Sequence, residues 1–213
     1  MKTDELVAAL SASVEPVSRR LVSRSVGIAL AIGAALAIGA ISVGLGVRAD
    51  LTTLRAVLFL LLKLAFAFVI IGVAAAYLVR LARPGGERTI SAGLAAIPFV
   101  AIMVLAAITL GQAPNSHWDR MVMGDEWLEC LLSIPIIAIV PFAVIIFAVR
   151  RAAPTSLVRA GAFSGLLAGG VSALAYALHC TDDSLPFVAL WYGGTIVLCT
   201  LAGAAFGPRL LRW

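Results

Sequence analysis

Six stretches of about twenty residues, each nearly free of charged side chains, constrain this chain more than any other feature of its sequence. The hydrocarbon core of a bilayer is about 30 Å thick, and a helix needs roughly 20 apolar residues to cross it. The sequence therefore predicts an all-α polytopic membrane protein with six transmembrane helices. We place the spans at Val26–Val47, Ala56–Val79, Ile90–Leu110, Leu128–Val149, Leu157–Leu178 and Pro186–Gly207.

The composition supports a membrane location and excludes other classes of protein. Of the 213 residues, 62% are apolar and 13% are charged, whereas roughly a quarter of the residues in a soluble domain are charged. Three cysteines are too few for a disulfide-stapled fold. We expect an N-terminal cytoplasmic tail at 1–25, a membrane domain at 26–207 and a C-terminal tail at 208–213. No connecting segment can bury a core of its own, so we expect no appended catalytic domain.

The positions of the 16 lysines and arginines predict the orientation of the chain. With the N-terminus inside, twelve of them fall on the inner side, three fall in outer loops, and Lys63 lies within the second span. Because cytoplasmic loops of membrane proteins are enriched in basic residues, both termini are predicted to be cytoplasmic. The positive net charge therefore indicates orientation in a bilayer rather than direct binding of nucleic acid.

Small residues at four-residue spacing predict how the helices pack. Lipid gives helices no hydrophobic drive to associate, so they meet where glycine and alanine permit close approach. We expect packing within one chain, with a dimer seam as the alternative, and the oligomeric state stays open. The stripe of the fifth span is Gly161, Gly165, Gly169, Ala173 and Ala177. The stripe of the first span is Gly27, Ala31, Ala35 and Gly39, and that of the sixth span is Gly203 and Gly207.

Two charges near the ends of spans are candidates for a functional role. Lys63 lies seven residues beyond Ala56 in the second span, and an ionisable residue within a membrane helix is a functional candidate by default. Glu129, at the outer end of the fourth span, is the predicted carboxylate partner of Lys63. A structural ion pair, or a lysine side chain that reaches the headgroups, is the alternative to a transport role.

Most residues that could carry chemistry are expected at the outer face. Their spacing matches no zinc-binding pattern such as C-x-x-C or H-E-x-x-H, and no serine lies in a nucleophile elbow. We therefore predict no metal site, no cofactor and no enzymatic activity. The residues are His117, His179, Cys130, Cys180, Glu126, Asp182 and Asp183.

The three cysteines are of two kinds. Cys199 lies deep in the sixth span and is expected to fill apolar space. Cys130 begins the fourth span and Cys180 follows the fifth, so both are expected at the outer face and at one membrane depth. In an oxidising compartment, such a pair can form a disulfide or react as separate thiols. Two unrelated interfacial cysteines are the alternative.

The N-terminal tail contains one short amphipathic pattern. The segment Thr3–Glu5 supplies a helix cap and an acidic first turn, and Leu6, Leu10 and Val14 follow at four-residue spacing. A helix this short is not stable alone in water. We expect these three residues to contact a protein partner or the membrane surface.

Three segments of the chain resemble the negative regulator of sigma F (NrsF) family. They are the tail from Thr3 to Arg20, the Trp127-Leu128-Glu129-Cys130 stretch, and the segment from Leu178 to Tyr192 with its Leu-His-Cys sequence. The resemblance covers nearly the whole chain. It implies an inner-membrane anti-sigma factor that holds an extracytoplasmic-function sigma factor inactive until a stress signal arrives. It also implies a signalling role for Cys130 and Cys180, with His179 beside the latter.

Functions from two other classes stay open in the sequence. A small permease or ion transporter would use Lys63 and the outer acidic loops, but no acidic residue lies deep in a span to bind a cation. A structural subunit of a larger membrane complex would use the glycine stripes. The regulator, in contrast, is expected to have a sigma factor and the lipid bilayer as partners.

Reporter fusions test the predicted orientation. A reporter fused after Trp213 is expected to be active only in the cytoplasm, and one inserted between Gly111 and Trp127 only outside it. The bias of basic residues toward one side of the membrane is the physical reason. Alkaline phosphatase and a cytoplasmic fluorescent protein at each site measure the result, and the reverse pattern would contradict the orientation.

Overall fold

The computed structural model describes residues 3–12, 21–81, 92–152 and 154–212. Within these residues the fold is all helical, and six helical segments are long and apolar enough to cross a membrane. This confirms the six helices predicted from the sequence. The long helices are α2 (Leu21–Gly44), α3 (Leu54–Leu81), α4 (Ile97–Gln112), α6 (Trp127–Arg150), α7 (Leu157–Tyr176) and α9 (Gly193–Leu210).

Short helical elements precede or extend the long ones. The tail forms α1 (Thr3–Ala12) and the 3-10 turn η2 (Ala92–Ala96) leads into α4. A second turn and α5 precede α6, and one α-helical turn and a π-helical segment precede α9. These elements are η3 (Asn115–His117), α5 (Trp118–Met123), α8 (Leu185–Phe187) and η4 (Val188–Tyr192).

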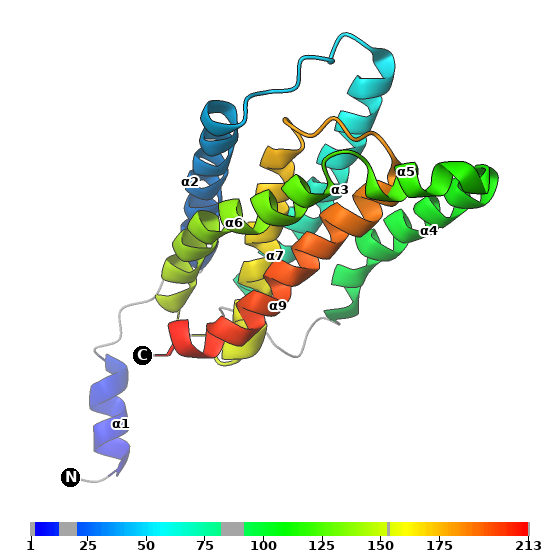
Figure 1. Cartoon of the computed structure of the whole chain (residues 1–213). Coiled ribbons are helices and arrows are strands. Elements are labelled where there is room, and N and C mark those ends of the chain that lie inside the picture. The colour runs from blue at the N-terminus through cyan, green and yellow to red at the C-terminus, as the bar shows by residue number, and fades with distance from the viewer. Residues whose placement is uncertain (1–2, 13–20, 82–91, 153, 213) are drawn as a thin grey trace.

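Helix α7 forms the centre of the bundle (Figure 1). It contacts α2, α3, α6 and α9, whereas α4 lies at the edge against α3, α8 and η4. Most side chains of α7 are buried, and its apolar window has the lowest mean hydropathy of the six spans. A helix surrounded by other helices faces protein rather than lipid, so glycine and serine are tolerated on all of its sides.

The glycine stripes of α7 and α9 face each other. A Cβ atom added to Gly161 would lie 2.6 Å from the Cα of Gly207, and one added to Gly203 would lie 2.9 Å from the Cα of Gly165. Only hydrogen in place of a side chain permits such a close approach of two backbones. The prediction that the fifth-span stripe packs within the chain is therefore confirmed.

The stripe predicted for the first span does not pack within the chain. Gly27 and Gly39 have nothing within 4 Å of an added Cβ, and Ala31 and Ala35 are exposed. The buried stripe of α2 is instead Ala29, Gly33, Ala37 and Ile41. Its position is set by α6, because an added Cβ on Gly33 would lie 3.2 Å from the ring of Pro141.

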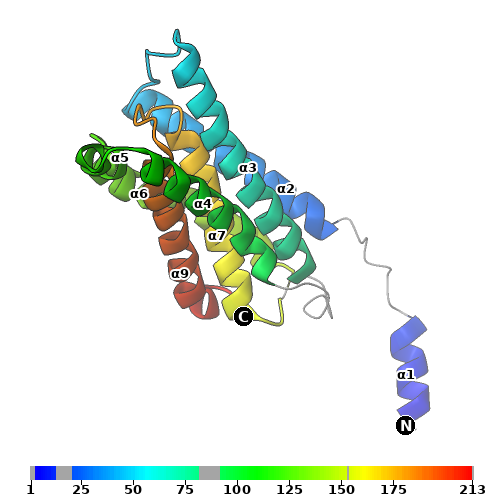
Figure 2. The same cartoon turned by 90° about the vertical axis from the view of Figure 1, so that its right-hand side faces the viewer.

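The two ends of the bundle differ in what they carry. Helix α1 and the last turn of α9 lie toward one end, which we call the C-terminal end (Figures 1 and 2). The opposite end, which we call the α5 end, carries α5 and residues 177–184 between α7 and α8. An even number of long helices returns the chain to its starting end, in agreement with termini on one side.

Replacement of Gly203 by alanine tests the contact between α7 and α9. The added methyl group has no space, so Gly203→Ala is expected to lower the free energy of unfolding by about 1–3 kcal/mol. Gly194→Ala is the matched control, because nothing lies within 4 Å of an added Cβ on Gly194 in the same helix. Unfolding in mixed detergent micelles measures both, and equal stability of the two variants would contradict this packing.

Candidate functional site

Two buried basic side chains lie at the α5 end of the bundle. Within the described residues, Lys63 of α3 and Arg48 between α2 and α3 are the buried charged groups. A charge removed from water is costly unless it is paired and hydrogen-bonded. Both side chains find their partners in residues 177–184, which we call the cysteine loop because it contains Cys180.

The ammonium group of Lys63 is fully buried and contacts the cysteine loop. Nζ donates to the carbonyl oxygen of Cys180 at 3.0 Å and to Oδ1 of Asp183 at 3.3 Å, and it lies 3.6 Å from Sγ of Cys180. The Tyr192 ring centre lies 5.7 Å away, within range of a cation–π contact. The side chain thus ends inside the protein, in agreement with a structural ion pair.

Asp183 is the carboxylate partner of Lys63, and the predicted pairing with Glu129 is wrong. Glu129 lies in the first turn of α6 with 63% of its side chain exposed, and its Oε2 is 4.0 Å from Nε2 of His179. The other ring nitrogen of His179 lies 3.0 Å from the carbonyl oxygen of Gly46. The sequence places Glu129 and Asp183 at the same end of the bundle. The cysteine loop is the segment that brings Asp183 to Lys63.

Arg48 connects the α2–α3 segment to the same loop. Its guanidinium donates to Asp50 at 2.6 and 2.7 Å, to Asp183 at 3.1 and 2.8 Å, and to the carbonyl oxygen of Cys180 at 3.1 Å. The hydrogen bonds that Arg48 donates to Asp50 and to Asp183 raise the pKa of Arg48, and Arg48 in turn lowers the pKa of Asp50. A planar, permanently charged guanidinium suits such a shared site.

A reciprocal set of hydrogen bonds holds the cysteine loop to the start of α6. Asp182 accepts the backbone N–H of Asp125 at 3.1 Å and that of Glu126 at 2.8 Å. The Glu126 carboxylate accepts the N–H of Thr181 at 3.2 Å and its hydroxyl at 2.9 Å. The first N–H groups of a helix lack partners within the helix and favour negative charge, so this contact is favourable for both segments.

The two outer cysteines predicted from the sequence are both free and fully buried. Cys130 lies in the first turn of α6, and Cys180 lies in the cysteine loop. Burial raises the pKa of the Cys180 thiol to about 11, and the Lys63 ammonium opposes the rise. Since the thiolate is the reactive form, Cys180 is expected to react slowly near neutral pH and faster as pH rises.

One group of residues brings together atoms that could bind a metal ion. Donor atoms of Glu126, Cys180 and Asp182 all lie within 4.8 Å of one another. Both carboxylates already accept hydrogen bonds from the backbone, so a metal ion would have to displace them. No metal site is predicted from the sequence at these residues, because no short motif links Glu126 to Cys180 and Asp182.

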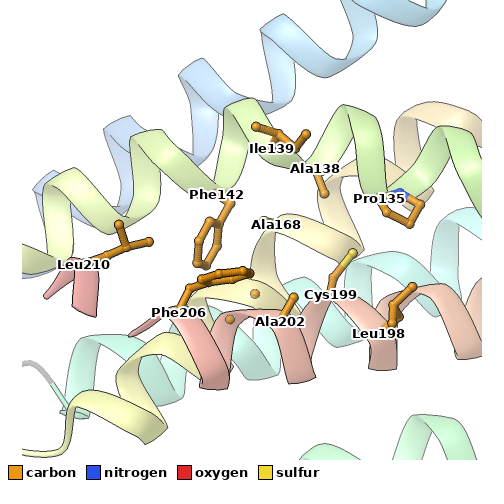
Figure 3. A pocket seen from close by; sticks show the side chains of 12 residues that line it. Pro135, Ala138, Ile139, Phe142, Ala168, Leu198, Cys199, Ala202, Phe206 and Leu210 are labelled. Carbon is orange, nitrogen blue, oxygen red and sulfur yellow. The ribbon is translucent and has the colours of Figure 1, made fainter. Parts of the chain in front are cut away.

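Cys199 belongs to a different part of the molecule. It lines an apolar cavity of about 280 Å³ between α6 and α9, with α7 as the floor (Figure 3). The Phe142 and Phe206 rings approach each other there, and the Cys199 sulfur points into the space. The apolar surroundings agree with Cys199 as a filler of apolar space. The other wall residues include Pro135, Ala138, Leu198 and Ala202.

The structure describes only part of the predicted tail site. Leu6 lies in α1 with 44% of its surface exposed, and the neighbouring Val7 is 59% exposed. Leu10 belongs to the same helix, while Val14 lies outside the described residues. The start of the tail is thus helical from Thr3 to Ala12, whereas the three residues are not seen as one surface.

Taken together, these features define a small all-helical protein with six helices long and apolar enough to cross a membrane, and with a polar end that contains two buried thiols. Comparison with known proteins identifies its family. The family "NrsF: Negative regulator of sigma F" matches residues 10–213. The chain therefore belongs to the NrsF family.

Two curated relatives support this assignment. The chain is 30% identical over 213 residues, and over the full length of both chains, to a protein of Azospira oryzae called "Probable anti-sigma-F factor NrsF". It is 33% identical over 135 residues to the "Anti-sigma-F factor NrsF" of Caulobacter vibrioides, which covers 63% of each chain. No solved structure matches the chain significantly.

Replacement of Asp183 by asparagine tests the charged network. Removal of one partner of a buried ion pair costs about 3–5 kcal/mol, and because 11% of the Asp183 side chain stays exposed we expect a loss near the lower figure. Glu129→Gln is the control, since this exposed acid was the alternative partner of Lys63. Its effect should stay within about 0.5 kcal/mol. A thermal or detergent unfolding series that finds the larger loss for Glu129→Gln would contradict the assignment.

Proposed function

We propose that this protein is an inner-membrane anti-sigma factor that holds an extracytoplasmic-function sigma factor at the cytoplasmic face and releases it on a stress signal from outside. The observation that carries the proposal is the relative called an anti-sigma-F factor, which aligns with the chain over its full length. The proposed topology follows the predicted one, with the C-terminal end of the bundle in the cytoplasm. The α5 end and its thiols then face the periplasm.

Helix α1 is the proposed contact for the sigma factor. Figures 1 and 2 place it apart from the bundle on the side of the C-terminal end, and Leu6 and Val7 are exposed apolar residues on it. An amphipathic helix commonly binds by placing its apolar side in a groove of the partner. A short helix that needs a partner to be stable suits a contact that can be released.

Cys130 and Cys180 are the proposed sensing residues. Support comes from the burial of both thiols and from the position of Cys180, which lies next to the Lys63 ion pair in a loop that two other segments hold in place. Protein interiors are closely packed, so a change of size or charge at a buried sulfur disturbs the packing around it. Displacement of the cysteine loop would move the start of α6 and the end of α7. These two helices extend to the C-terminal end of the bundle.

The transporter alternative loses its main support at Lys63. Its ammonium is paired with Asp183 and fully buried, whereas a residue that binds a transported ion must be reached by it. Within the described residues, two cavities that lie between the spans are lined almost entirely by apolar residues, so they give no polar route through the bundle. No specific observation therefore favours this second function.

The tail proposal is tested by placing charge on one side of α1. In a strain that carries a sigma-factor-dependent reporter, the double variant Leu6→Asp and Leu10→Asp is expected to lose repression. An unpaired carboxylate buried at an apolar contact costs several kcal/mol. Reporter activity is measured without stress, and membrane content is measured in parallel.

The matched control places the same charges on the opposite side of the helix. At 3.6 residues per turn, Ala8 and Ala12 lie across α1 from Leu6 and Leu10. Ala8→Asp with Ala12→Asp should keep repression. Loss of repression in both double variants, or in neither, would contradict a contact through the Leu6 side.

The sensing proposal is tested by removal of the outer thiols. Strains with Cys130→Ser or Cys180→Ser should insert the protein and repress normally, but should no longer respond to an inducing oxidant, because serine lacks the oxidisable sulfur. Cys199→Ser should respond like the parent protein. A double variant that responds as the parent does would overturn the role of these cysteines.

A further inference from the structure

The Lys63 side chain places an amine next to a thiol in the interior of the protein. Nζ of Lys63 lies 3.6 Å from Sγ of Cys180, and both residues are fully buried. The same nitrogen lies 3.3 Å from Oδ1 of Asp183, so a carboxylate that can accept a proton is adjacent. Cys180 and Asp183 belong to the cysteine loop, and the Lys63 side chain contacts both of them from α3.

We propose that Lys63 and Cys180 form a redox-dependent covalent link, a sulfenamide between Nζ and Sγ, when Cys180 is oxidised by a peroxide. A sulfenic acid condenses with a thiol or with a nitrogen, the latter giving a sulfenamide. The inference deepens the proposed sensing role of Cys180 and rests on it only in that Cys180 is the thiol oxidised. It assigns Lys63 as the residue that captures the oxidised sulfur.

The reaction has two steps. In the first, hydrogen peroxide transfers one oxygen atom to the Cys180 thiol, which gives a sulfenic acid and one water. In the second, the Lys63 ammonium gives a proton to Asp183, the free amine attacks the sulfur, and the sulfur–oxygen bond breaks. The departing hydroxide takes a second proton from the nitrogen and leaves as water. The sulfur loses two electrons to the peroxide. The products are a single bond between Sγ of Cys180 and Nζ of Lys63, with one hydrogen left on the nitrogen, one proton passed to Asp183, and two waters in total.

Two features of the site favour the entry of a molecule as small as hydrogen peroxide. A polar cavity of about 520 Å³ borders the cysteine loop, and Asp183 lines it while also binding Lys63. The hydroxyl of Tyr192 is fully buried and interacts with the Cys180 thiol, so a polar group accompanies the sulfur inside the protein. The ring of this tyrosine is the one that lies beside Nζ.

The link would remove one of the two positive charges that hold the loop. Lys63 becomes neutral when its nitrogen is bonded to sulfur, and its proton leaves through Asp183, so the ion pair between them is lost. Arg48 is then the charged group that holds Asp183. Oxidation would in this way replace one ion pair of the loop by a covalent bond, and a thiol reductant would reverse the change.

Peptide mapping of the full-length protein tests the proposal. Membranes that contain the protein are treated with hydrogen peroxide, free thiols are blocked, and the purified chain is digested with chymotrypsin and examined by mass spectrometry. We expect a peptide pair joined through Lys63 and Cys180, lighter by two hydrogen atoms than its separate parts and released by dithiothreitol. The same pair should form in Cys130→Ser, which cannot make a disulfide with Cys180.

Lys63→Arg is the matched control, because arginine keeps the positive charge for Asp183 but lacks the nucleophilic amine. This variant should form no link, and its Cys180 should instead be labelled by dimedone, which traps sulfenic acids. The proposal is overturned if the parent protein forms only a Cys130–Cys180 disulfide, or if Cys130→Ser is oxidised at Cys180 without any joined Lys63 peptide. The readout is independent of a sigma factor, so a failed link and a failed regulatory role are distinguished.

Discussion

The buried ammonium group of Lys63 determines how the α5 end of the bundle is built. A cation in an apolar interior requires acceptors around it, and α3 provides none on its own. The cysteine loop supplies them by turning inward, with the Asp183 carboxylate and the Cys180 carbonyl oxygen both on Nζ. Arg48 adds a second cation to the same carboxylate, so the α2–α3 segment follows the loop. One charge thereby fixes the relative positions of segments that are far apart in the sequence.

The features predicted correctly from the sequence are those that depend on a single segment of the chain. Span length and apolar character predicted the six helices, and the fifth-span stripe of Gly161, Gly165 and Gly169 predicted close packing because glycine on a helix has few other purposes at such spacing. Lys63 was identified as unusual because a charge within a span is rare. In each of these cases the physical constraint acts within one helix.

The sequence failed where the outcome depended on a second segment. Small residues are common throughout α2, and only the ring of Pro141 on α6 decides that Gly33, rather than Gly27 or Gly39, is buried. Asp183 was missed as the partner of Lys63 because its position depends on the path of a loop, and periodicity carries no information about loops. Arg48 and Tyr192 were missed for the same reason, although the close spacing of Arg48 and Asp50 could have indicated an ion pair.

The two ends of the bundle are joined by helices that run between them. Helix α6 begins where the Glu126 carboxylate accepts a hydrogen bond from the Thr181 hydroxyl, and α7 ends at the cysteine loop. Within α6, Pro141 is packed against Gly33, whereas Pro135 borders the apolar cavity of Figure 3. The helix is therefore tightly held at one proline and faces open space at the other. A continuous helix that runs from one end of the bundle to the other can pass a change at one end to the other.

We propose that the protein holds a sigma factor through its N-terminal helix. Co-purification tests this contact. The full-length protein, with an affinity tag after Trp213, is solubilised from membranes with mild detergent, and bound proteins are identified by mass spectrometry. The account predicts one extracytoplasmic-function sigma factor in near-equal amount, bound to the parent chain and absent from a chain that lacks residues 3–12. A parent chain that carries no sigma factor, or an equal amount of it bound without α1, would contradict the account.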